Sequence, residues 1–372
     1  DKAHESVLKE LRATGRLYDV FEKIEKPLII VAEEMHRDGV AVNVPYLKAL
    51  SKEYAQELAK IEKRVYKQAG REFNISSPKQ LGEVLFDELK LSLPRQKKTA
   101  TGARTTKEDE LQKMSDQHPI IEDVLVYREL SKLLSTYVTK LPDEVGPDGR
   151  LHATFLQAGT TTGRMASIDP NLQNIPIRTD YGKRIREAFV AEKGSVLVAL
   201  DYSQIELRVA AGLSGDKKLV GVFKENGDIH SAVAAEVFGV PPEMVDREMR
   251  RRAKIINFGI LYGMGVNALR ESLGANVTRE EAGKFLDDYF ENFGELSRWI
   301  KNQKASAARL GYTETLFGRR RYFTGFKSPL PYVRAQAERM AVNAPIQGTQ
   351  ADVIKLAMVE ANRLLEREGL HK

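Results

Sequence analysis

A run near the middle of the chain, Ser195–Arg208 (SVLVALDYSQIELR), constrains the possible folds more than any other segment. Its apolar part, Val196–Leu200, predicts a buried strand, and a helical pattern of apolar residues begins at Ile205. Asp201 lies between the two. A carboxylate at the carboxyl end of a buried strand is well placed to bind a divalent cation. Because Asp is also a favoured helix N-cap, these residues alone leave metal binding and capping equally open.

The composition bounds the class of protein. A chain of 372 residues is long enough for two or three domains. Its 58 Lys and Arg against 52 Asp and Glu give a net charge of +6, which permits a nucleic-acid partner without requiring one. The absence of cysteine excludes a disulfide scaffold, cysteine-bound zinc and a thiol nucleophile. Without an apolar run of the ~20 residues that a membrane span needs, and without a signal peptide, we expect a soluble cytoplasmic protein with no membrane partner. The lack of an initial Met indicates a fragment.

The N-terminal part is predicted to be mostly helical, elongated and charged at its surface. Apolar residues at helical spacing indicate five helices: Asp1–Lys26, Pro27–Gly39, Tyr46–Gln68, Lys79–Leu89 and Ile120–Leu141. Gly39 is a typical helix C-cap. The turn-forming segment Pro142–Arg150 (PDEVGPDGR) then marks a domain boundary.

Two segments of this part are candidates for contact with a polyanion. The cluster Asn74–Pro78 (NISSP) precedes a helix, and such an N-terminus can hold phosphate, although plain capping is the commoner role. The segment Arg95–Lys107 (RQKKTATGARTTK) is basic and has no core pattern, so we expect a mobile, exposed loop. Polyanion contact and simple solvation of this loop are equally favoured.

After Leu151 the pattern changes to strands and turns, and amide side chains gather in Asp169–Arg178 (DPNLQNIPIR). Amides reach base edges and sugars in a minor groove, and Arg164 and Arg178 suit phosphate. Asx-Pro runs also build turns without any ligand. Nucleic-acid contact and turn formation therefore have equal weight at this point.

Four residues of Arg250–Gly263 recur at every fourth position: Arg250, Lys254, Phe258 and Tyr262. On one helix they share a face that carries two cations at one end and two aromatic rings at the other. Cations suit a triphosphate, and aromatic rings suit a base or sugar. The alternative is that the rings belong to the core and the cations to a solvated end. A separate apolar face is already supplied by Ile255, Ile256, Ile260 and Leu261. The sequence therefore favours a binding face.

Other segments carry weaker signals. A lone histidine beside an aspartate, His230, is expected to be a surface or capping residue. Glu280–Gly311 predicts a helical pair, and Phe317–Phe323 (FGRRRYF) predicts either a nucleic-acid contact or a packed hairpin. Tyr332–Met358 predicts a long helix that is broken at Pro345.

Four of these segments together resemble motifs of family A DNA polymerases, the bacterial DNA polymerase I type. VALDYSQIELR is similar to motif A, and RRAKIINFGILYG is similar to motif B. TTGRMASIDPNLQNIP resembles the primer–template segment, and AERMAVNAPIQGTQAD resembles the helix that precedes motif C. The motifs follow the family's order, and the likeness covers essentially the whole chain.

The resemblance implies an α+β fold with a right-hand architecture of helical thumb, palm with an antiparallel sheet, and helical fingers. The implied domains are a lead-in helix at 1–26, the thumb at 27–148, a first part of the palm at 149–215, the fingers at 216–330 and an incomplete second part of the palm at 331–372. It also implies a nucleotidyltransferase of DNA replication and repair. Such an enzyme extends a primer 3′-hydroxyl with dNTPs on a DNA template and releases pyrophosphate.

The resemblance also implies roles for the site residues. Two Mg²⁺ ions, or Mn²⁺, are expected, with the Asp201 carboxylate and the Tyr202 backbone carbonyl as ligands. Lys254 is the implied general acid for pyrophosphate, and Glu206 blocks a 2′-hydroxyl. The other implied nucleotide-binding residues are His230 and Arg250 near the triphosphate, Phe258 at the sugar and base, Tyr262 at the template-base position, and Gln204. The implied DNA-binding residues are Arg164, Lys132, Asn171, Gln173, Asn174, Arg178 and Gln347, with Asn74, Ser76 and Ser77 from the thumb.

Two departures from the family pattern qualify this prediction. Only 26 residues precede the expected thumb, so we expect no exonuclease domain there. The family's His-Asp-Glu motif C, whose Asp is a shared metal ligand, is not found before Lys372. We therefore expect a polymerase whose motif C lies on another segment, or else a chain that binds primer–template and dNTP without extending. A structural or unrelated nucleic-acid-binding protein would leave the Arg250–Tyr262 face unexplained.

Overall fold

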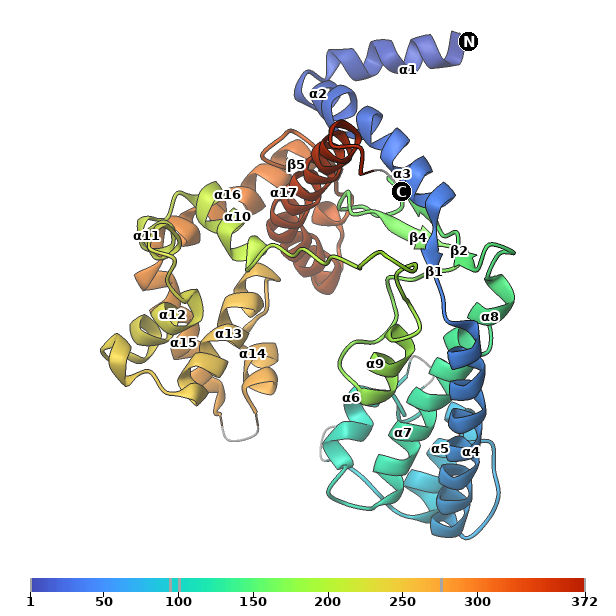
Figure 1. The fold of residues 1–372 in the computed structure, drawn as a ribbon. Helices are drawn as coiled ribbons and strands as arrows, with labels where there is room; N and C mark the ends of the chain where they lie inside the picture. The colour runs from blue at the N-terminus through green and yellow to red at the C-terminus, as the bar shows by residue number, and fades with distance from the viewer. Residues whose placement is uncertain (1, 94–95, 100–101, 275–276, 371–372) are drawn as a thin grey trace. The chain divides into compact units, whose positions relative to one another are not determined.

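The computed structural model describes residues 2–93, 96–99, 102–274 and 277–370 (Figure 1). The chain forms two compact units. The first unit comprises Asp1–Glu34, Phe155–Ala166 and Ala199–Lys372, and the second unit comprises Met35–Thr154 and Ser167–Val198. Each unit has its own hydrophobic core. No helix in the described ranges is long and apolar enough to cross a membrane.

The core of the second unit is built around two helices, α4 (Val44–Ala69) and α7 (Ile120–Leu133), which pack against each other (Figure 1). Helix α4 begins at Asn43, whose side chain accepts a hydrogen bond from the Tyr46 backbone N–H at 3.0 Å. It ends at Gly70, which has a φ of 75°, so the predicted helix Tyr46–Gln68 is confirmed. The other helical elements here are α5 (Pro78–Gly82), η2 (Glu83–Glu88), α6 (Glu108–Leu111), η3 (Gln112–Met114), η4 (Leu134–Val138), α8 (Leu141–Glu144) and α9 (Asp180–Arg186).

The first unit is also helical, and α12 (Ile229–Phe238) packs against α13 (Arg247–Leu261) in its core. The predicted helical pair at Glu280–Gly311 is confirmed as α15 (Arg279–Asn292) and α16 (Gly294–Leu310). The other helical elements after residue 200 are α10 (Ile205–Ser214), α11 (Lys217–Lys224), η5 (Pro242–Met244), α14 (Val266–Leu273), η6 (Gly325–Lys327) and α17 (Pro331–Arg367).

The N-terminal segment is not the single helix that we predicted for Asp1–Lys26. Helix α1 (Lys2–Ala13) ends before a turn, and α2 (Arg16–Val20) and the π-helix η1 (Phe21–Glu25) follow. The turn contains Gly15 with a φ of 64°, a left-handed conformation that glycine adopts at little cost. Helix α3 (Lys26–Asp38) then runs to Gly39, which has a φ of 59° and ends the helix as predicted.

Short strands form three two-stranded sheets in the described part of the chain. Strand β1 (Val40–Ala41) pairs antiparallel with β2 (Arg150–Leu151), β3 (Thr154–Leu156) pairs with β4 (Ala166–Ile168), and β5 (Tyr312–Glu314) pairs antiparallel with β6 (Arg320–Tyr322). The segment Phe317–Phe323 therefore takes part in a hairpin. Small antiparallel sheets among many helices confirm the predicted α+β class.

The predicted buried strand at Val196–Leu200 is wrong for this structure. The segment has irregular backbone, and Val196 and Leu200 are 81 % and 93 % exposed. A strand needs a neighbour that pairs with its backbone and covers its apolar side chains. No described residue pairs with this segment, which explains why its apolar pattern does not lead to a strand.

The predicted helix break at Pro345 is also wrong. Helix α17 runs without interruption from Pro331 to Arg367, and Pro345 lies buried inside it. Proline removes one backbone hydrogen bond, but the helix around it is held by packing, since Val342 and Ile346 belong to the core of the first unit.

A buried charge cluster fixes α17 within the first unit. The Lys355 ammonium group lies 2.7 Å from a carboxylate oxygen of Glu25 and donates a hydrogen bond to the Gln157 backbone carbonyl at 3.1 Å. The Arg319 guanidinium pairs with the same Glu25 carboxylate and with Asp352, which is 2.7 Å away. Because Lys355 and Asp352 are almost fully buried, this cluster joins η1, the turn after β5 and α17 into one structure.

Candidate functional site

The predicted helix that carries Arg250, Lys254 and Phe258 is present as α13. Asp246 caps the helix by accepting a hydrogen bond from the Met249 backbone N–H at 2.7 Å. Arg250 and Lys254 are exposed, whereas Ile256 and Ile260 are buried in the core on another side of the helix. The helix therefore separates its apolar face from its cationic face, as predicted.

Arg250 is held by an acidic partner that the sequence analysis did not identify. Its Nε and Nη2 atoms lie 2.6 Å and 3.3 Å from the carboxylate oxygens of Asp228, at the N-terminus of α12. The same carboxylate accepts from Ser231 at 2.6 Å and caps the helix through the His230 backbone N–H. Burial raises the pKa of Asp228, but the hydrogen bonds from Arg250 and Ser231 outweigh that effect and lower the pKa to about 2. The Arg250 guanidinium is thus held by the Asp228 carboxylate, which is ionised at neutral pH.

His230 is neither a surface residue nor a side-chain cap. Its ring is 4 % exposed, and its centroid lies 5.9 Å from that of the Phe258 ring. Burial lowers the pKa of His230; the positive charges of Arg250 and Lys254 act in the same direction and Asp228 acts against it. The structure therefore brings His230 to the same face of α13 as Arg250, Lys254 and Phe258.

A second cluster joins three of the predicted site residues. The Glu206 carboxylate, in the first turn of α10, accepts from the Tyr262 hydroxyl at 3.0 Å and from Arg164 Nη2 at 3.0 Å. Arg164 also donates to the side chain of Gln350 at 2.9 Å, a contact that local sequence patterns could not reveal. Burial and the Glu206 charge raise the pKa of Tyr262, and Gln347 acts in the opposite direction. Glu206 thus contacts both Tyr262, which directly follows α13, and Arg164, which lies before β4.

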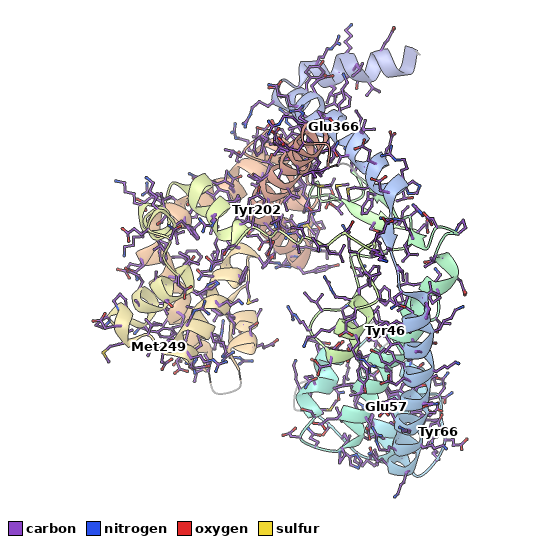
Figure 2. The ribbon with its side chains drawn as sticks, in the orientation of Figure 1. Tyr46, Glu57, Tyr66, Tyr202, Met249 and Glu366 are labelled. Atoms are coloured by element: carbon purple, nitrogen blue, oxygen red, sulfur yellow. The ribbon has the colours of Figure 1, made fainter. Side chains whose placement is uncertain are left out.

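The acidic residue of the opening segment does not cap a helix. Helix α10 begins at Gln204, which has a φ of 56° and makes no capping hydrogen bond through its side chain. Asp201 is exposed three residues earlier, and Tyr202 (Figure 2) is 49 % exposed. The capping alternative for Asp201 is therefore wrong, and its carboxylate is accessible.

Asp201 and Tyr202 offer oxygen donors for a divalent cation. A carboxylate and a backbone carbonyl are the oxygen ligands that Mg²⁺ prefers, and Mg²⁺ commonly takes only one or two protein carboxylates together with substrate phosphates. Among the described residues no group of three acidic or histidine side chains is arranged to hold a metal ion. The donors fit Mg²⁺ in type, and further ligands would have to come from phosphate or from groups outside the described residues.

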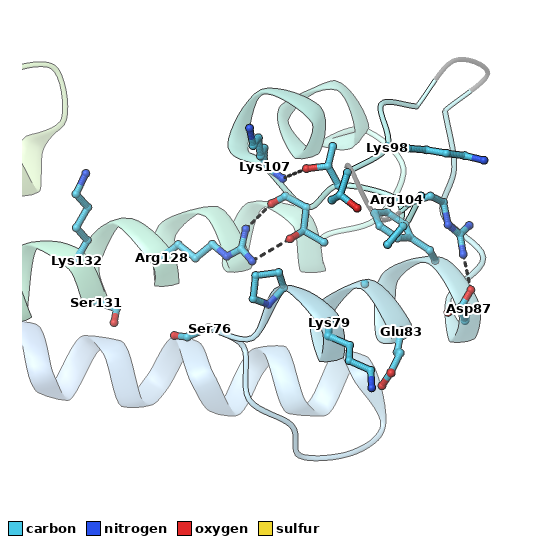
Figure 3. A pocket seen from close by; sticks show the side chains of 18 of the residues that line it. Ser76, Lys79, Glu83, Asp87, Lys98, Arg104, Lys107, Arg128, Ser131 and Lys132 are labelled. Carbon is cyan, nitrogen blue, oxygen red and sulfur yellow. Dashed lines mark hydrogen bonds and ion pairs between the residues drawn. The ribbon is translucent and has the colours of Figure 1, made fainter.

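In the second unit, predicted DNA-binding residues line two cavities. The larger, of about 1240 Å³, is lined by Ser76 and Lys132 and by further cations and hydroxyl groups (Figure 3). The smaller, of about 590 Å³, is lined by Lys132, Asn171 and Asn174. Lys132 lines both cavities. The other cations at the larger cavity are Lys79, Lys98, Arg104, Lys107 and Arg128.

The expectation of an exposed loop at Arg95–Lys107 holds for most of its described residues, although Thr105 and Thr106 are buried; Arg95, Ala100 and Thr101 lie outside the described residues. Contacts from other elements hold this segment. The Lys97 backbone N–H donates to the buried Glu110 carboxylate at 3.1 Å, and Lys98 pairs with Arg104 as a β-bridge. Arg128 donates to the backbone carbonyl and the hydroxyl of Thr106 (Figure 3). These contacts come from α6 and α7, so the local sequence pattern could not reveal them.

Some predicted DNA-binding residues have local structural roles. Ser77 accepts from the Gln80 backbone N–H as the cap of α5, and the Asn74 side chain accepts from the Ser76 backbone N–H at 3.0 Å. The Asn171 side chain accepts from the Gln173 backbone N–H at 3.1 Å. Ser77 therefore caps α5, and Asn74 forms a turn before it, while Asn171 combines a turn contact with an exposed position. Asn174 and Arg178 are exposed as well.

The chain matches a known protein family. The family model described as "DNA polymerase family A" matches residues 44–372. Since the match covers most of its length, the chain belongs to DNA polymerase family A.

Individual relatives agree. The chain is 50 % identical over 371 residues to "DNA polymerase I, thermostable" of Thermus caldophilus, covering 99 % of this chain and 44 % of that protein. It is 45 % identical to DNA polymerase I of Pseudomonas aeruginosa, covering 99 % and 40 %. The chain thus spans less than half the length of these curated relatives. It is also similar to the solved "POL domain of Pol1 from M. smegmatis complex with DNA primer-template and dNTP", with a TM-score of 0.88, 40 % identity, and coverage of 97 % of this chain and 63 % of that one.

Proposed function

We propose that this chain is the polymerising part of a DNA-directed DNA polymerase that extends a primer 3′-hydroxyl with dNTPs and releases pyrophosphate. The observation that carries the proposal is the grouping of Arg250, Lys254, His230 and Phe258 at one face of α13. Two cations beside an aromatic ring suit a triphosphate joined to a base and sugar. Family membership supports this interpretation, as does the likeness to a solved domain in complex with DNA primer-template and dNTP.

Each residue of this face receives a role in the proposal. Arg250 binds phosphate oxygens in exchange for Asp228, and Lys254 binds the triphosphate and protonates the leaving pyrophosphate. His230 donates a hydrogen bond to the triphosphate, and Phe258 packs on the sugar and base. Tyr262, Glu206 and Gln204 complete the pocket: Tyr262 occupies the template-base position, and Glu206 excludes a 2′-hydroxyl.

For the metal we propose Asp201 and the backbone carbonyl of Tyr202 as the protein ligands of Mg²⁺. When bound, Mg²⁺ would neutralise charge on the phosphates and activate the primer hydroxyl. The hypothesis includes two metal ions, for which Mn²⁺ can substitute. It also includes a motif C carboxylate that lies on another segment and binds these ions. The exposure of Asp201 and its lack of a capping role support it.

For the primer–template we propose contacts from both units. In the second unit, the two cavities are lined by Lys132, Ser76, Asn171 and Asn174. The further proposed contacts are Arg164, Gln173, Arg178 and Gln347. In this proposal, residues 27–148 form the thumb, residues 149–215 and 331–372 form the palm, and residues 216–330 form the fingers. The six cations of the larger cavity support binding to a phosphate backbone.

Primer extension with Mg²⁺ and all four dNTPs tests the proposed function. Extension by this polypeptide alone would support a complete polymerase site, and would contradict the alternative of a chain that only binds. Extension that appears only after adding a segment with a His-Asp-Glu motif would support the divided site. No extension in either format, with intact binding of primer–template and dNTP, would leave the binding-only alternative.

Replacing Lys132 with glutamine will weaken duplex DNA binding by a similar factor on all sequences. A lysine that neutralises one phosphate releases about one counterion, so the slope of log K against log salt should fall by about 1. Fluorescence anisotropy over a series of salt concentrations measures the slope. Lys60→Gln is the matched control, since Lys60 is an exposed lysine of α4 that pairs with Glu57 and lines neither cavity. An equal loss in both variants would assign the effect to net charge alone.

A further inference from the structure

Three buried polar side chains form a line that ends at His230. The Tyr289 hydroxyl, from α15, donates to Asn257 Oδ1 at 3.1 Å, and Asn257 Nδ2, from α13, lies 3.1 Å from His230 Nδ1. Tyr289 and Asn257 are 0 % exposed, and His230 is 4 % exposed. None of the roles proposed above uses Asn257 or Tyr289.

The count of donors decides how the protons are arranged along this line. Reversing the Asn257 amide would turn its NH₂ group toward Tyr289, and the Tyr289 hydroxyl proton would then need another acceptor. No second hydrogen-bond partner of that hydroxyl exists among the described residues. A buried donor without an acceptor is strongly disfavoured. Tyr289 therefore donates to the amide oxygen, and the amide NH₂ donates to His230 Nδ1.

This arrangement leaves only one place for the proton of a neutral imidazole. Because Nδ1 accepts a hydrogen bond, the proton lies on Nε2. Nε2 has no hydrogen-bond partner in the described part of the chain, so its N–H is an available donor. The charged groups around the ring are Asp228 at the start of its own helix and Arg250 and Lys254 on α13. Burial and the two cations lower the pKa of His230, and this effect outweighs the opposing charge of Asp228, so the neutral imidazole is favoured.

We propose that Asn257 and Tyr289 are positioning residues that hold His230 in the Nε2–H tautomer, so that it donates a hydrogen bond to a phosphate oxygen of the incoming nucleotide. The nucleotide part rests on the proposed function; the tautomer part depends only on the three side chains. Asn257 and Tyr289 touch no reacting group. They act through the imidazole alone, by fixing which nitrogen is a donor.

Long-range ¹H–¹⁵N correlation spectra of the full chain with ¹⁵N-labelled histidine test the tautomer directly. His230→Gln identifies the His230 signals. We expect the Nε2–H pattern at neutral pH in the unaltered chain. In Tyr289→Phe, which keeps the ring and removes only the hydroxyl, the amide is free to reverse, and we expect a mixture of tautomers. In Asn257→Asp, the carboxylate accepts from Nδ1–H, and we expect the proton on Nδ1 and a raised pKa of the imidazole.

Controls separate positioning from general damage to the fold. Tyr54→Phe is the matched variant, because Tyr54 is also fully buried and its hydroxyl donates to the Tyr181 carbonyl at 2.6 Å in the second unit. It should leave the His230 spectrum unchanged. An Nδ1–H tautomer in the unaltered chain would overturn the proposal. So would an unchanged tautomer in a folded Tyr289→Phe variant, even if Asn257→Asp fails to fold.

Addition of Mg²⁺–dATP to the same labelled sample tests the nucleotide part. We expect the His230 Nε2 signal to shift in the unaltered chain and to shift less in Tyr289→Phe. If the tautomer is as expected but the signal does not respond to Mg²⁺–dATP, the proposed role of His230 in nucleotide binding is wrong and the tautomer assignment stands. A response with the wrong tautomer would overturn the positioning role while supporting the nucleotide site.

Discussion

Replacing Asp201 with alanine will reduce primer extension by about 10³-fold while leaving the affinity for duplex DNA nearly unchanged. A bound metal ion contributes several kcal/mol of charge stabilisation, and about 4 kcal/mol corresponds to about 10³ in rate. The side chain is exposed and caps no helix, so its removal should not disturb the fold. The rate is measured by single-turnover extension, in whichever format supports extension by the unaltered chain, and binding is measured by anisotropy.

The matched control for this substitution is Asp180→Ala. The Asp180 side chain is 94 % exposed, and among the described residues it pairs only with Lys183, three residues along α9. This variant should extend primers as fast as the unaltered chain. Loss of duplex binding in Asp201→Ala, with normal binding in Asp180→Ala, would instead give Asp201 a structural role. Full activity of Asp201→Ala would remove it from the metal site.

The parts of the site that sequence could predict are those set by one helix. Arg250, Lys254 and Phe258 share a face because the helical repeat places every fourth residue on one side, and nothing outside α13 is needed to know it. Asp228, which holds Arg250, and Asn257, which contacts His230, depend on how α12 packs against α13. No local pattern contains that information, so the residues alone predicted His230 to be a surface or capping residue.

The same distinction explains the errors in the fold. A helix satisfies its own backbone, so α4 and α13 could be predicted from spacing alone. A strand depends on a neighbour, and Val196–Leu200 has no paired neighbour in the described structure. The segment Arg95–Lys107 lacks a core pattern, yet Arg128 and Glu110 anchor it from later in the chain. Tertiary contacts also keep α17 continuous through Pro345.

Replacing Glu25 with glutamine will destabilise the first unit by about 3 kcal/mol. The change leaves Lys355, which is almost fully buried, and Arg319 without the shared carboxylate, and removing one partner of a buried ion pair typically costs about 3–5 kcal/mol. The expected cost lies at the low end of this range because the Glu25 side chain is 19 % exposed and partly solvated. Urea unfolding followed by the fluorescence of Trp299, the single tryptophan, reports on the first unit, since Trp299 lies in α16.

A matched variant and the pH dependence make this prediction specific. Glu22→Gln, in the same π-helix, removes a partly exposed i,i+4 pair with Lys26 and should cost about 0.5 kcal/mol or less. Burial raises the pKa of Glu25, but the hydrogen bond from Lys355 and the charges of Arg319 and Lys355 bring it below 4.5. A carboxyl group with a lowered pKa stabilises the fold above its ordinary pKa and loses that effect as the pH falls through the folded value. The difference between the unaltered chain and Glu25→Gln should therefore shrink below pH 4.5, and a difference independent of pH would show that the glutamine acts through packing rather than charge.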